Sequence, residues 1–192
     1  VSHLRGLSCF ALPKLLRYIL RVDVGLLEVD LVNSHPVHML RLVPAERRPV
    51  FEALRHYVDR RDEVLRDLGL EVGASRDVMK TVILGVCYGG GPAKLLHELA
   101  GFKGRPPALI MDLSKEVAAI AHLIATLFPV EFGALKVELE AREAARSTLA
   151  PRTASAEVRF LAHRLAMAQR ETLERMAALL PSAPVSYERD AL

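Results

Sequence analysis

Apolar positions recur every three or four residues through most of this chain, a spacing that predicts helices. The helices predicted in this way cover residues 36–43, 44–68, 75–88, 93–100, 112–127, 131–147 and 157–180. Two short apolar runs, residues 25–32 and 185–190, instead predict buried strands. Residues 7–22 fit either a helix or a join between a strand and a helix.

Several polar and glycine residues mark where these helices begin and end. Ser75 is typical of an N-cap, and Asp77 follows in the first turn, where the helix dipole favours a carboxylate. Gly69 and Gly73 close the preceding helix, and the run Gly89-Gly-Gly-Pro92 ends the helix that Ser75 begins. The helix over residues 75–88 is therefore predicted with defined boundaries.

The composition fits a globular chain of 192 residues, of which 51% are apolar and 26% charged. A net charge of +3 permits a polyanionic partner without requiring one. Two cysteines do not make a disulfide framework, and neither a secretory signal nor a membrane span is visible, so we expect an intracellular protein. The chain begins with Val1 and ends two residues after Asp190, and we expect the natural protein to be longer at both ends.

One predicted helix carries two cations that share a face. Arg76 and Lys80 lie about 40° apart around the helix axis, one turn from each other, and Tyr88 lies two turns further along. Two neighbouring cations followed by an aromatic ring suit a nucleoside triphosphate, although a solvated charged face has the same pattern. Gly85 costs about 1 kcal/mol inside a helix, so close approach of a substrate or of another helix is expected there.

The spacing Arg-x3-Lys-x4-Gly-x2-Tyr-Gly, over residues 76–89, resembles motif B of family A nucleic acid polymerases, the DNA polymerase I-like class. In that family this helix belongs to the fingers and holds the incoming nucleotide. The resemblance implies that Arg76, Lys80, Gly85 and Tyr88 line the substrate site, with Lys80 counted among the catalytic residues.

A second resemblance lies about 50 residues upstream. Asp30 follows the apolar run 25–29 and precedes a turn and a helix, as the metal-binding Asp of polymerase motif A does. The resemblance implies that Asp30 and the backbone carbonyl of Leu31 bind metal. His35 stands five residues after Asp30, where family A DNA polymerases usually place a Glu under the nucleotide sugar. His35 is therefore expected to contact the sugar, either by excluding a 2′-hydroxyl or by hydrogen bonding to it.

The third element is Arg189-Asp190 at the end of the predicted strand 185–190, which resembles the His-Asp of motif C. Asp30 and Asp190 would together hold two Mg²⁺ ions roughly 4 Å apart, the arrangement that phosphoryl transfer uses. We expect both residues to be catalytic and their carboxylates to lie close together.

These resemblances imply an α/β, helix-dominated fold, with a small central sheet in a palm (residues 1–43 and 106–192) and helical fingers (residues 44–105). The implied function is template-directed nucleotidyl transfer to a primer 3′-end. The implied partners are a DNA primer-template and nucleoside triphosphates, with Mg²⁺ as cofactor and no membrane. The sequence predicts no oligomeric state.

Other interpretations stay open at this point. The chain is also compatible with a single-subunit RNA polymerase or primase, an inactive nucleic-acid-binding remnant of a polymerase, or a helical protein-interaction domain. His35 and His38 could form a metal pair, but no third ligand follows at a usual spacing. Cys87 is predicted to be a core residue, since it sits within an apolar helix.

Overall fold

The computed structural model describes residues 33–144 and 154–178. The chain divides into two compact units, one of residues Asn33–Thr172 and one that joins Val1–Val32 to Leu173–Leu192. Most of the second unit lies outside the described residues, so the fold below is that of Asn33–Thr172.

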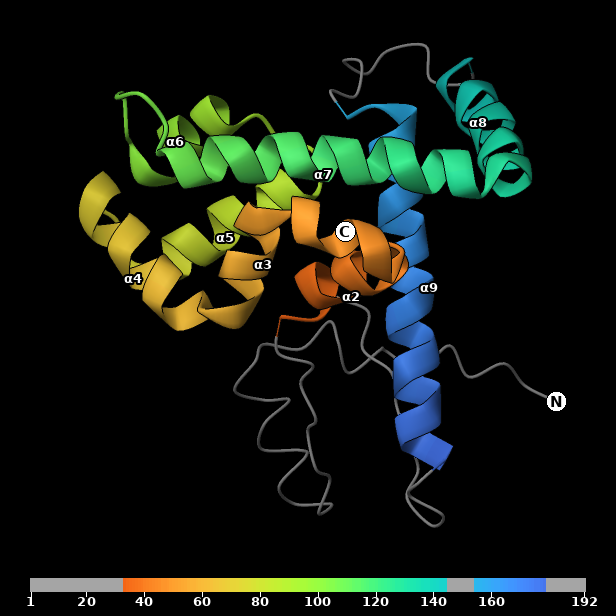
Figure 1. Ribbon diagram of the computed structural model, residues 1–192. Helices are drawn as coiled ribbons and strands as arrows, with labels where there is room; N and C mark the ends of the chain where they lie inside the picture. Colours follow the sequence, from red (N-terminus) through yellow and green to blue (C-terminus); the bar gives the residue numbers. More distant parts are fainter. Residues whose placement is uncertain (1–32, 145–153, 179–192) are drawn as a thin grey trace, which may run out of the picture. The chain divides into compact units, whose positions relative to one another are not determined.

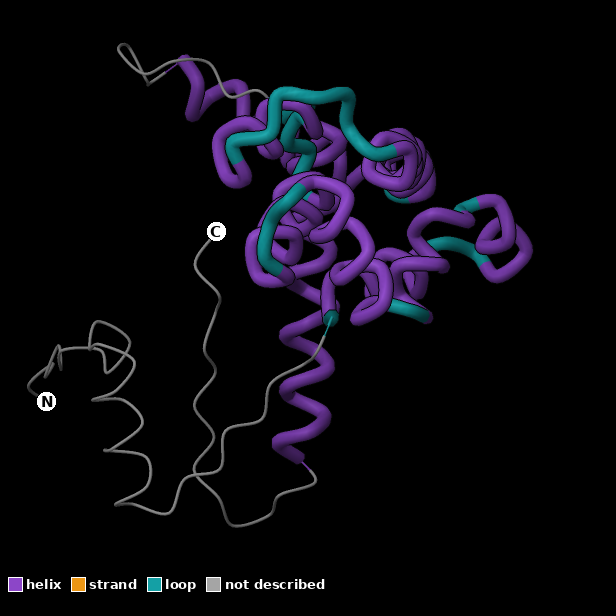
Figure 2. The backbone as a smooth tube through the Cα atoms, turned by 90° about the vertical axis from the view of Figure 1, so that its left-hand side faces the viewer, coloured by secondary structure: helices purple, strands orange, loops and turns teal. Residues whose placement is uncertain are grey.

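Helices make up this unit, with short connections between them (Figures 1 and 2). In chain order they are α2 (Ser34–Leu42), the 3₁₀-helix η2 (Ala45–Val50), α3 (Glu52–Asp59), α4 (Arg61–Val72), α5 (Arg76–Cys87), α6 (Pro92–Ala100), α7 (Ala108–Leu127), α8 (Pro129–Ala144) and α9 (Ala156–Ala178). The predicted helices over 75–88, 93–100 and 157–180 are confirmed over the described residues. Helix α7 begins at Ala108, four residues earlier than predicted, directly after Pro106 and Pro107.

The long helix α7 organises the core. It packs against α3, α5 and α6 along its length and against α8 near its end (Figure 1). The face of α7 that points inward is fully apolar and carries Ile110, Leu113, Val117, Ile120, Ala121 and Ile124. Helix α5 lies at the centre of the remaining contacts, with α4, α6 and α7 against it. One continuous core therefore spans helices on both sides of residue 105, and the division into fingers and palm stays a prediction.

The predicted α/β fold with a small central sheet is wrong. Residues 33–144 and 154–178 contain no strand. Their apolar positions repeat with the period of a helix and never alternate over a long stretch, so nothing in them favours pairing of extended segments. The two segments predicted as strands, 25–32 and 185–190, lie outside the described residues.

The single helix predicted over residues 44–68 is also wrong in its extent. Three shorter elements, η2, α3 and α4, occupy this part of the chain. Pro49 lies inside η2, where the lack of an N–H prevents a continuous α-helix. Arg60, with φ −127° and ψ 36°, breaks the chain again between α3 and α4. Helix α4 then continues through Gly69 and ends at Gly73, whose φ of 73° is left-handed.

A carboxylate from α7 caps the start of α3. The two oxygens of Glu116 accept hydrogen bonds from the backbone N–H groups of Ala53 and Leu54, at 2.9 and 2.8 Å. Phe51, the N-cap residue itself, offers no side-chain acceptor. Because the first N–H groups of a helix have no partner within it, Glu116 satisfies two of them from a distant helix.

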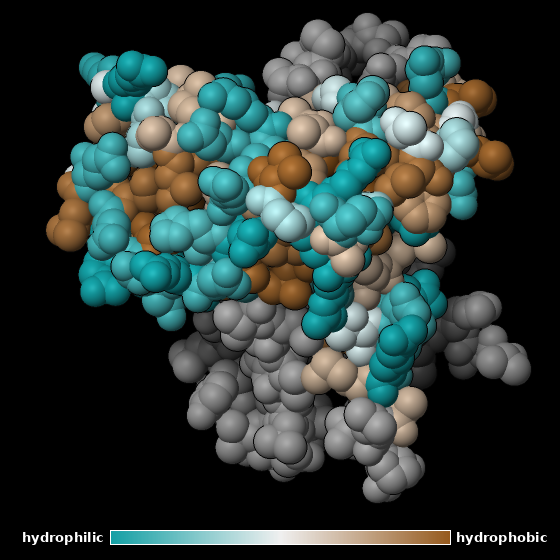
Figure 3. Space-filling view, viewed as in Figure 1, coloured by the Kyte–Doolittle hydropathy of each residue, from teal (hydrophilic) through white to brown (hydrophobic). Residues whose placement is uncertain are grey.

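Helix α8 leaves part of its apolar surface uncovered. Val130 and Val137 are 80% and 67% exposed, and Figure 3 shows hydrophobic surface over this helix. Among the described residues no single helix has the length and apolar composition to cross a membrane. Helix α7 and residues 129–141, joined at a bend of 108°, are together long and apolar enough for such a span, by length and composition only.

Candidate functional site

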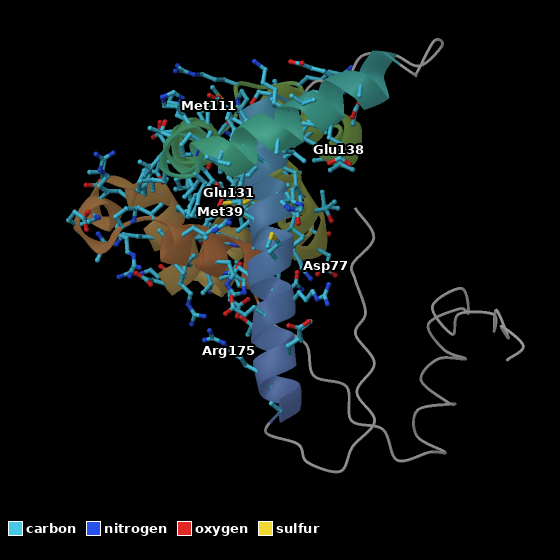
Figure 4. All side chains as sticks on the ribbon, turned by 90° about the vertical axis from the view of Figure 1, so that its right-hand side faces the viewer. Met39, Asp77, Met111, Glu131, Glu138 and Arg175 are labelled. Atoms are coloured by element: carbon cyan, nitrogen blue, oxygen red, sulfur yellow. The ribbon has the colours of Figure 1, made fainter. Side chains whose placement is uncertain are left out.

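The helix that carries the polymerase-like spacing, α5, is capped at its start as predicted. The hydroxyl oxygen of Ser75 accepts a hydrogen bond from the backbone N–H of Val78 at 3.3 Å. Asp77 lies in the first turn and projects outward (Figure 4). This local sequence signal therefore fixes where the helix begins and which residues form its first turn.

The other end of α5 is a Schellman motif built on glycine. The N–H of Gly90 donates to the carbonyl of Gly85 at 2.8 Å, and the N–H of Gly89 donates to the carbonyl of Val86 at 2.9 Å. Gly89 has a φ of 80°, which favours glycine. Tyr88 is thereby the last residue before the turn, and the Tyr-Gly pair of the motif coincides with the end of the helix.

Glycines also let neighbouring helices approach this end of α5. A Cβ on Gly85 would lie 2.8 Å from a methyl of Leu95 on α6, and one on Gly89 would lie 2.8 Å from a methyl of Val158 on α9. Packing between helices is therefore a sufficient reason for Gly85. Its predicted contact with substrate stays a prediction.

Tyr88 and His35 meet across 53 residues of sequence. The Tyr88 hydroxyl hydrogen-bonds to Nδ1 of His35, and the two rings contact edge to face with centroids 5.4 Å apart. On its other side, Nε2 of His35 lies 2.9 Å from Oε1 of Gln169. The contact joins three segments: the start of α2, the end of α5 and the middle of α9.

The turn before α2 sets the position of His35. Asn33 has a φ of 59° and a ψ of 29°, a left-handed conformation that asparagine tolerates better than most residues. Helix α2 begins at the next residue, Ser34, and His35 is its second residue. Both ring nitrogens of His35 have protein partners, Tyr88 and Gln169, and the metal pair with His38 stays a prediction. His38 is buried, and burial, with Arg41 and His35 nearby, lowers the pKa of its imidazole.

The two predicted phosphate ligands lie in the first half of α5, with Arg76 about 18 Å and Lys80 about 12 Å of helix from Tyr88. Arg76 forms an ion pair with Asp62 of α4 and lies 3.6 Å from Asp77. The Arg76 guanidinium also lowers the pKa of the Asp62 carboxyl, chiefly through this hydrogen bond. Lys80, one turn later, is exposed and has no ion-pair partner within residues 33–144 and 154–178. Arg76 and Lys80 thus share the exposed side of the helix.

An open groove runs beside Arg76, between the end of α4 and the start of α5. Asp62, Arg66 and Arg76 contribute its charged lining, and Leu70 its most exposed apolar side chain. The guanidinium groups of Arg66 and Arg76 and the carboxylate of Asp62 line the groove, which gives it an excess of positive charge. Its charge therefore suits an anion, with Asp62 as the competing partner of Arg76.

The chain matches no protein-family model, and no match is found among curated proteins or solved structures. Function is therefore inferred from the residues and their geometry alone.

Three of the predicted site residues, Asp30, Leu31 and Asp190, lie outside the described residues. In the part of the chain that the structure describes, no three His, Cys, Asp or Glu side chains gather as a metal site would require. The predicted Mg²⁺ site thus depends on Asp30 and Asp190, whose proximity stays a prediction.

Gln169 is the site residue that the sequence pattern did not identify. It follows Leu165 by four residues, so it falls on the apolar stripe of α9 at a position where a hydrophobic side chain is expected. A polar residue in an otherwise apolar stripe is the signal that could have pointed to it. Cys87 behaves as predicted: it is buried in the core, and burial raises the pKa of its thiol to about 12.

Proposed function

We propose that this chain is part of a template-directed nucleotidyltransferase that adds nucleoside triphosphates to a primer 3′-end. The observation that carries the proposal is the contact between His35 and Tyr88. The resemblance to family A polymerases assigns these two residues, from separate motifs, to the same incoming nucleotide. Their direct contact places them where one ligand could reach both.

The exposed side of α5 supplies the second support. Arg76 and Lys80 lie on it one turn apart, and Tyr88 follows the last residue of the same helix, about 18 Å from Arg76 and about 12 Å from Lys80. An extended nucleoside triphosphate could lie along such a helix, with its phosphates at the cations and its sugar near the ring of Tyr88. The two cations would offset the charge that develops on the leaving pyrophosphate.

Two Mg²⁺ ions belong to this proposal. The carboxylates of Asp30 and Asp190 and the carbonyl of Leu31 would hold them, and oxygen donors of this kind are those that Mg²⁺ prefers. The ions would supply the electrostatic stabilisation of phosphoryl transfer. The residues of α5 would bind and orient the triphosphate.

The proposal is tested by Mg²⁺-dependent primer extension with the full chain. Lys80→Ala should reduce kcat/KM for the nucleotide by about 2–4 kcal/mol of transition-state stabilisation. The control is Lys94→Ala, which removes another exposed lysine, paired with Glu98 on α6. Equal activity in the two variants would remove Lys80 from the site.

Asp30→Asn and Asp190→Asn should each abolish extension while the protein stays folded. An active Asp190→Asn variant would contradict the proposed metal site. A wild-type chain that binds a primer-template but never extends it would instead be an inactive relative of a polymerase.

A helical interaction domain is the second candidate, and the exposed Val130 and Val137 of α8 favour it. Nucleic acid binding separates the two. A polymerase-like chain should bind a primer-template with an affinity that falls steeply as salt rises, because cations on the protein displace counterions from the phosphates. An interaction domain should show no such binding.

A further inference from the structure

The groove between the end of α4 and the start of α5 already contains an anion of the protein's own. Asp62 and Arg66 lie one turn apart on α4, and Arg76 lines the same groove from the first turn of α5. The carboxylate of Asp62 forms an ion pair with the guanidinium of Arg76. The groove has a volume of about 650 Å³, within the usual range of small-molecule sites, roughly 300–1,000 Å³. Asp62 therefore occupies the cation that an anionic ligand of this groove would bind.

The ion pair between Asp62 and Arg76 is one that a stronger anion can displace. The two side chains are 75% and 45% exposed, and exposed ion pairs contribute little because water solvates both charges well. A terminal phosphate carries more charge than a carboxylate and can accept two hydrogen bonds from one guanidinium. A ligand with several phosphates therefore competes effectively with Asp62 for Arg76.

Arg66 offers such a ligand a second cation. It is exposed, and within residues 33–144 and 154–178 no carboxylate lies at ion-pair distance from it. Arg76 lowers the pKa of the Asp62 carboxyl most, chiefly through their hydrogen bond, and the charge of Arg66 lowers it further. Arg66 is thus near the carboxylate but free to bind another anion.

Arg61 gives Asp62 a second position. Nη1 of Arg61 lies 3.9 Å from Oδ1 of Asp62, and the Arg61 side chain is only 16% exposed, so solvent screens its charge less than that of Arg76. Nε of Arg61 is buried and has no hydrogen-bond partner in the part of the chain that the structure describes. This guanidinium therefore has unmet hydrogen-bonding capacity beside the carboxylate.

We propose that Asp62 is a displaceable counter-ion of Arg76. The terminal phosphates of a nucleoside triphosphate take Arg76 from it and bind between Arg76 and Arg66. Asp62 then moves to Arg61. This inference rests on the proposed function for the identity of its ligand, and the polymerase resemblance assigns only Arg76 of these four residues. In the free protein Asp62 keeps Arg76 paired, so ligands of low charge do not displace it.

The test measures the binding of inorganic tripolyphosphate to the full chain by titration calorimetry, in salt of about 0.1 M, where charges more than about 10 Å apart are screened. Asp62→Asn removes the competing charge at nearly constant size, and the affinity should rise by about three- to fivefold. Asp77→Asn is the matched control, because it removes a carboxylate that lies 3.6 Å from Arg76, beyond hydrogen-bonding distance. It should change the affinity by less than about twofold.

A double-mutant cycle separates displacement from simple charge repulsion. Arg76→Gln should weaken binding by about tenfold, the usual effect of a lost charged hydrogen bond. In that background Asp62→Asn should improve the affinity by less than about twofold, because no ion pair is left to break. Arg66→Gln should also weaken binding, by about three- to tenfold, whether or not Asp62 is present.

The second position of Asp62 has a readout of its own at Arg61. The ¹H–¹⁵N signal of the Arg61 Nε–H should shift when tripolyphosphate binds to the wild-type chain, because the carboxylate approaches this guanidinium. The same addition to Asp62→Asn should leave the signal almost unchanged. A signal that stays in place in the wild-type chain would overturn the move to Arg61.

The outcomes separate this inference from the proposed function. A wild-type chain that does not bind tripolyphosphate, or equal effects of Asp62→Asn and Asp77→Asn, would overturn the role of Asp62 and leave primer extension to be judged by its own assay. The expected binding results in a chain that never extends a primer would overturn nucleotidyl transfer, and Asp62 would remain the counter-ion of a polyphosphate site.

Discussion

Oε2 of Glu116 lies 2.8 Å from the backbone nitrogen of Leu54, although 62 residues separate them in the sequence. Oε1 of Glu116 also accepts a hydrogen bond from the backbone N–H of Ala53, so the two contacts tie the first turn of α3 to the middle of α7. Glu116 is only partly exposed, so solvent replaces these bonds poorly. Glu116 thus does for α3 what an N-cap side chain would do, since Phe51 at the N-cap position has no acceptor.

Glu116→Ala should lower the free energy of unfolding by about 1–2 kcal/mol, the usual cost of a lost N-cap. Urea denaturation followed by circular dichroism measures it. Glu140→Ala is the matched control, since Glu140 is exposed on α8 and makes only a 4.0 Å ion pair with Lys136. That change should cost less than about 0.5 kcal/mol. Similar losses in both variants would show that the cap contributes little.

Gly89→Ala and Gly101→Ala form a pair that separates backbone strain from steric overlap. Both glycines end helices with positive φ, at 80° and 65°, but only Gly89 has a neighbour in the path of a Cβ, a methyl of Val158 at 2.8 Å. Gly101→Ala should cost about 1 kcal/mol from the left-handed backbone alone. Gly89→Ala should cost about 1–3 kcal/mol more, because the methyl overpacks α9. Equal unfolding free energies for the two variants would contradict the close approach.

Stability should depend on pH through His38. Burial lowers its pKa in the folded protein below the ordinary value of 6.5, while the unfolded chain keeps the ordinary value. In the window between the two values the unfolded state binds more protons, so stability is complete above 6.5 and falls as the pH drops through the lowered pKa. Arg41 and His35 are the charged and titratable groups that act on it, and both oppose protonation.

His38→Leu should reduce the change of unfolding free energy with pH, which is measured from urea midpoints between pH 5 and pH 8. His163→Ala, at an exposed position of α9, should leave the slope as in the wild type. A slope that persists in His38→Leu would assign the pH dependence to another group.

Shortening His35 should change sugar selection without stopping extension. His35→Ala removes the ring that would clash with a 2′-hydroxyl, so ribonucleotide incorporation should rise while deoxynucleotide incorporation stays largely intact. Side-by-side extension with the two substrates measures the ratio. Wild-type preference for the ribonucleotide, lost in the Ala variant, would mean that His35 recognises the hydroxyl and that the enzyme is an RNA polymerase or primase.

Local signals in the sequence predicted much of the helical arrangement. Ser75 and the glycines after Tyr88 act within a few residues of themselves, so both ends of α5 could be predicted. The break at Arg60 could not, because neither Gly nor Pro stands near it and the helical spacing of apolar residues continues across it. The central sheet was an expectation from the polymerase resemblance, and the periodicity of the described residues did not support it.

The candidate site was predicted only in part, for a related reason. His35 and Tyr88 were both assigned to a nucleotide, but their direct contact depends on how α2 and α5 pack. Gln169 bonds to His35, 134 residues away, and Glu116 bonds to Ala53, 63 residues away. No sequence pattern within α9 or α7 predicts these partners. Long-range hydrogen bonds of this kind are set by packing and are invisible to helical periodicity.

The bond from the Gly90 amide to the Gly85 carbonyl has a consequence for motion. Gly90 is half-buried, and a Cβ built on it would lie 2.7 Å from a methyl of Leu95 on α6. The amide hydrogen of Gly90 can exchange with deuterium only when the junction of these helices opens. We therefore expect the amide of Gly90 to be among the slowest to exchange outside the regular helices. We also expect the backbone at Tyr88 to move together with the end of α5 and not independently of it.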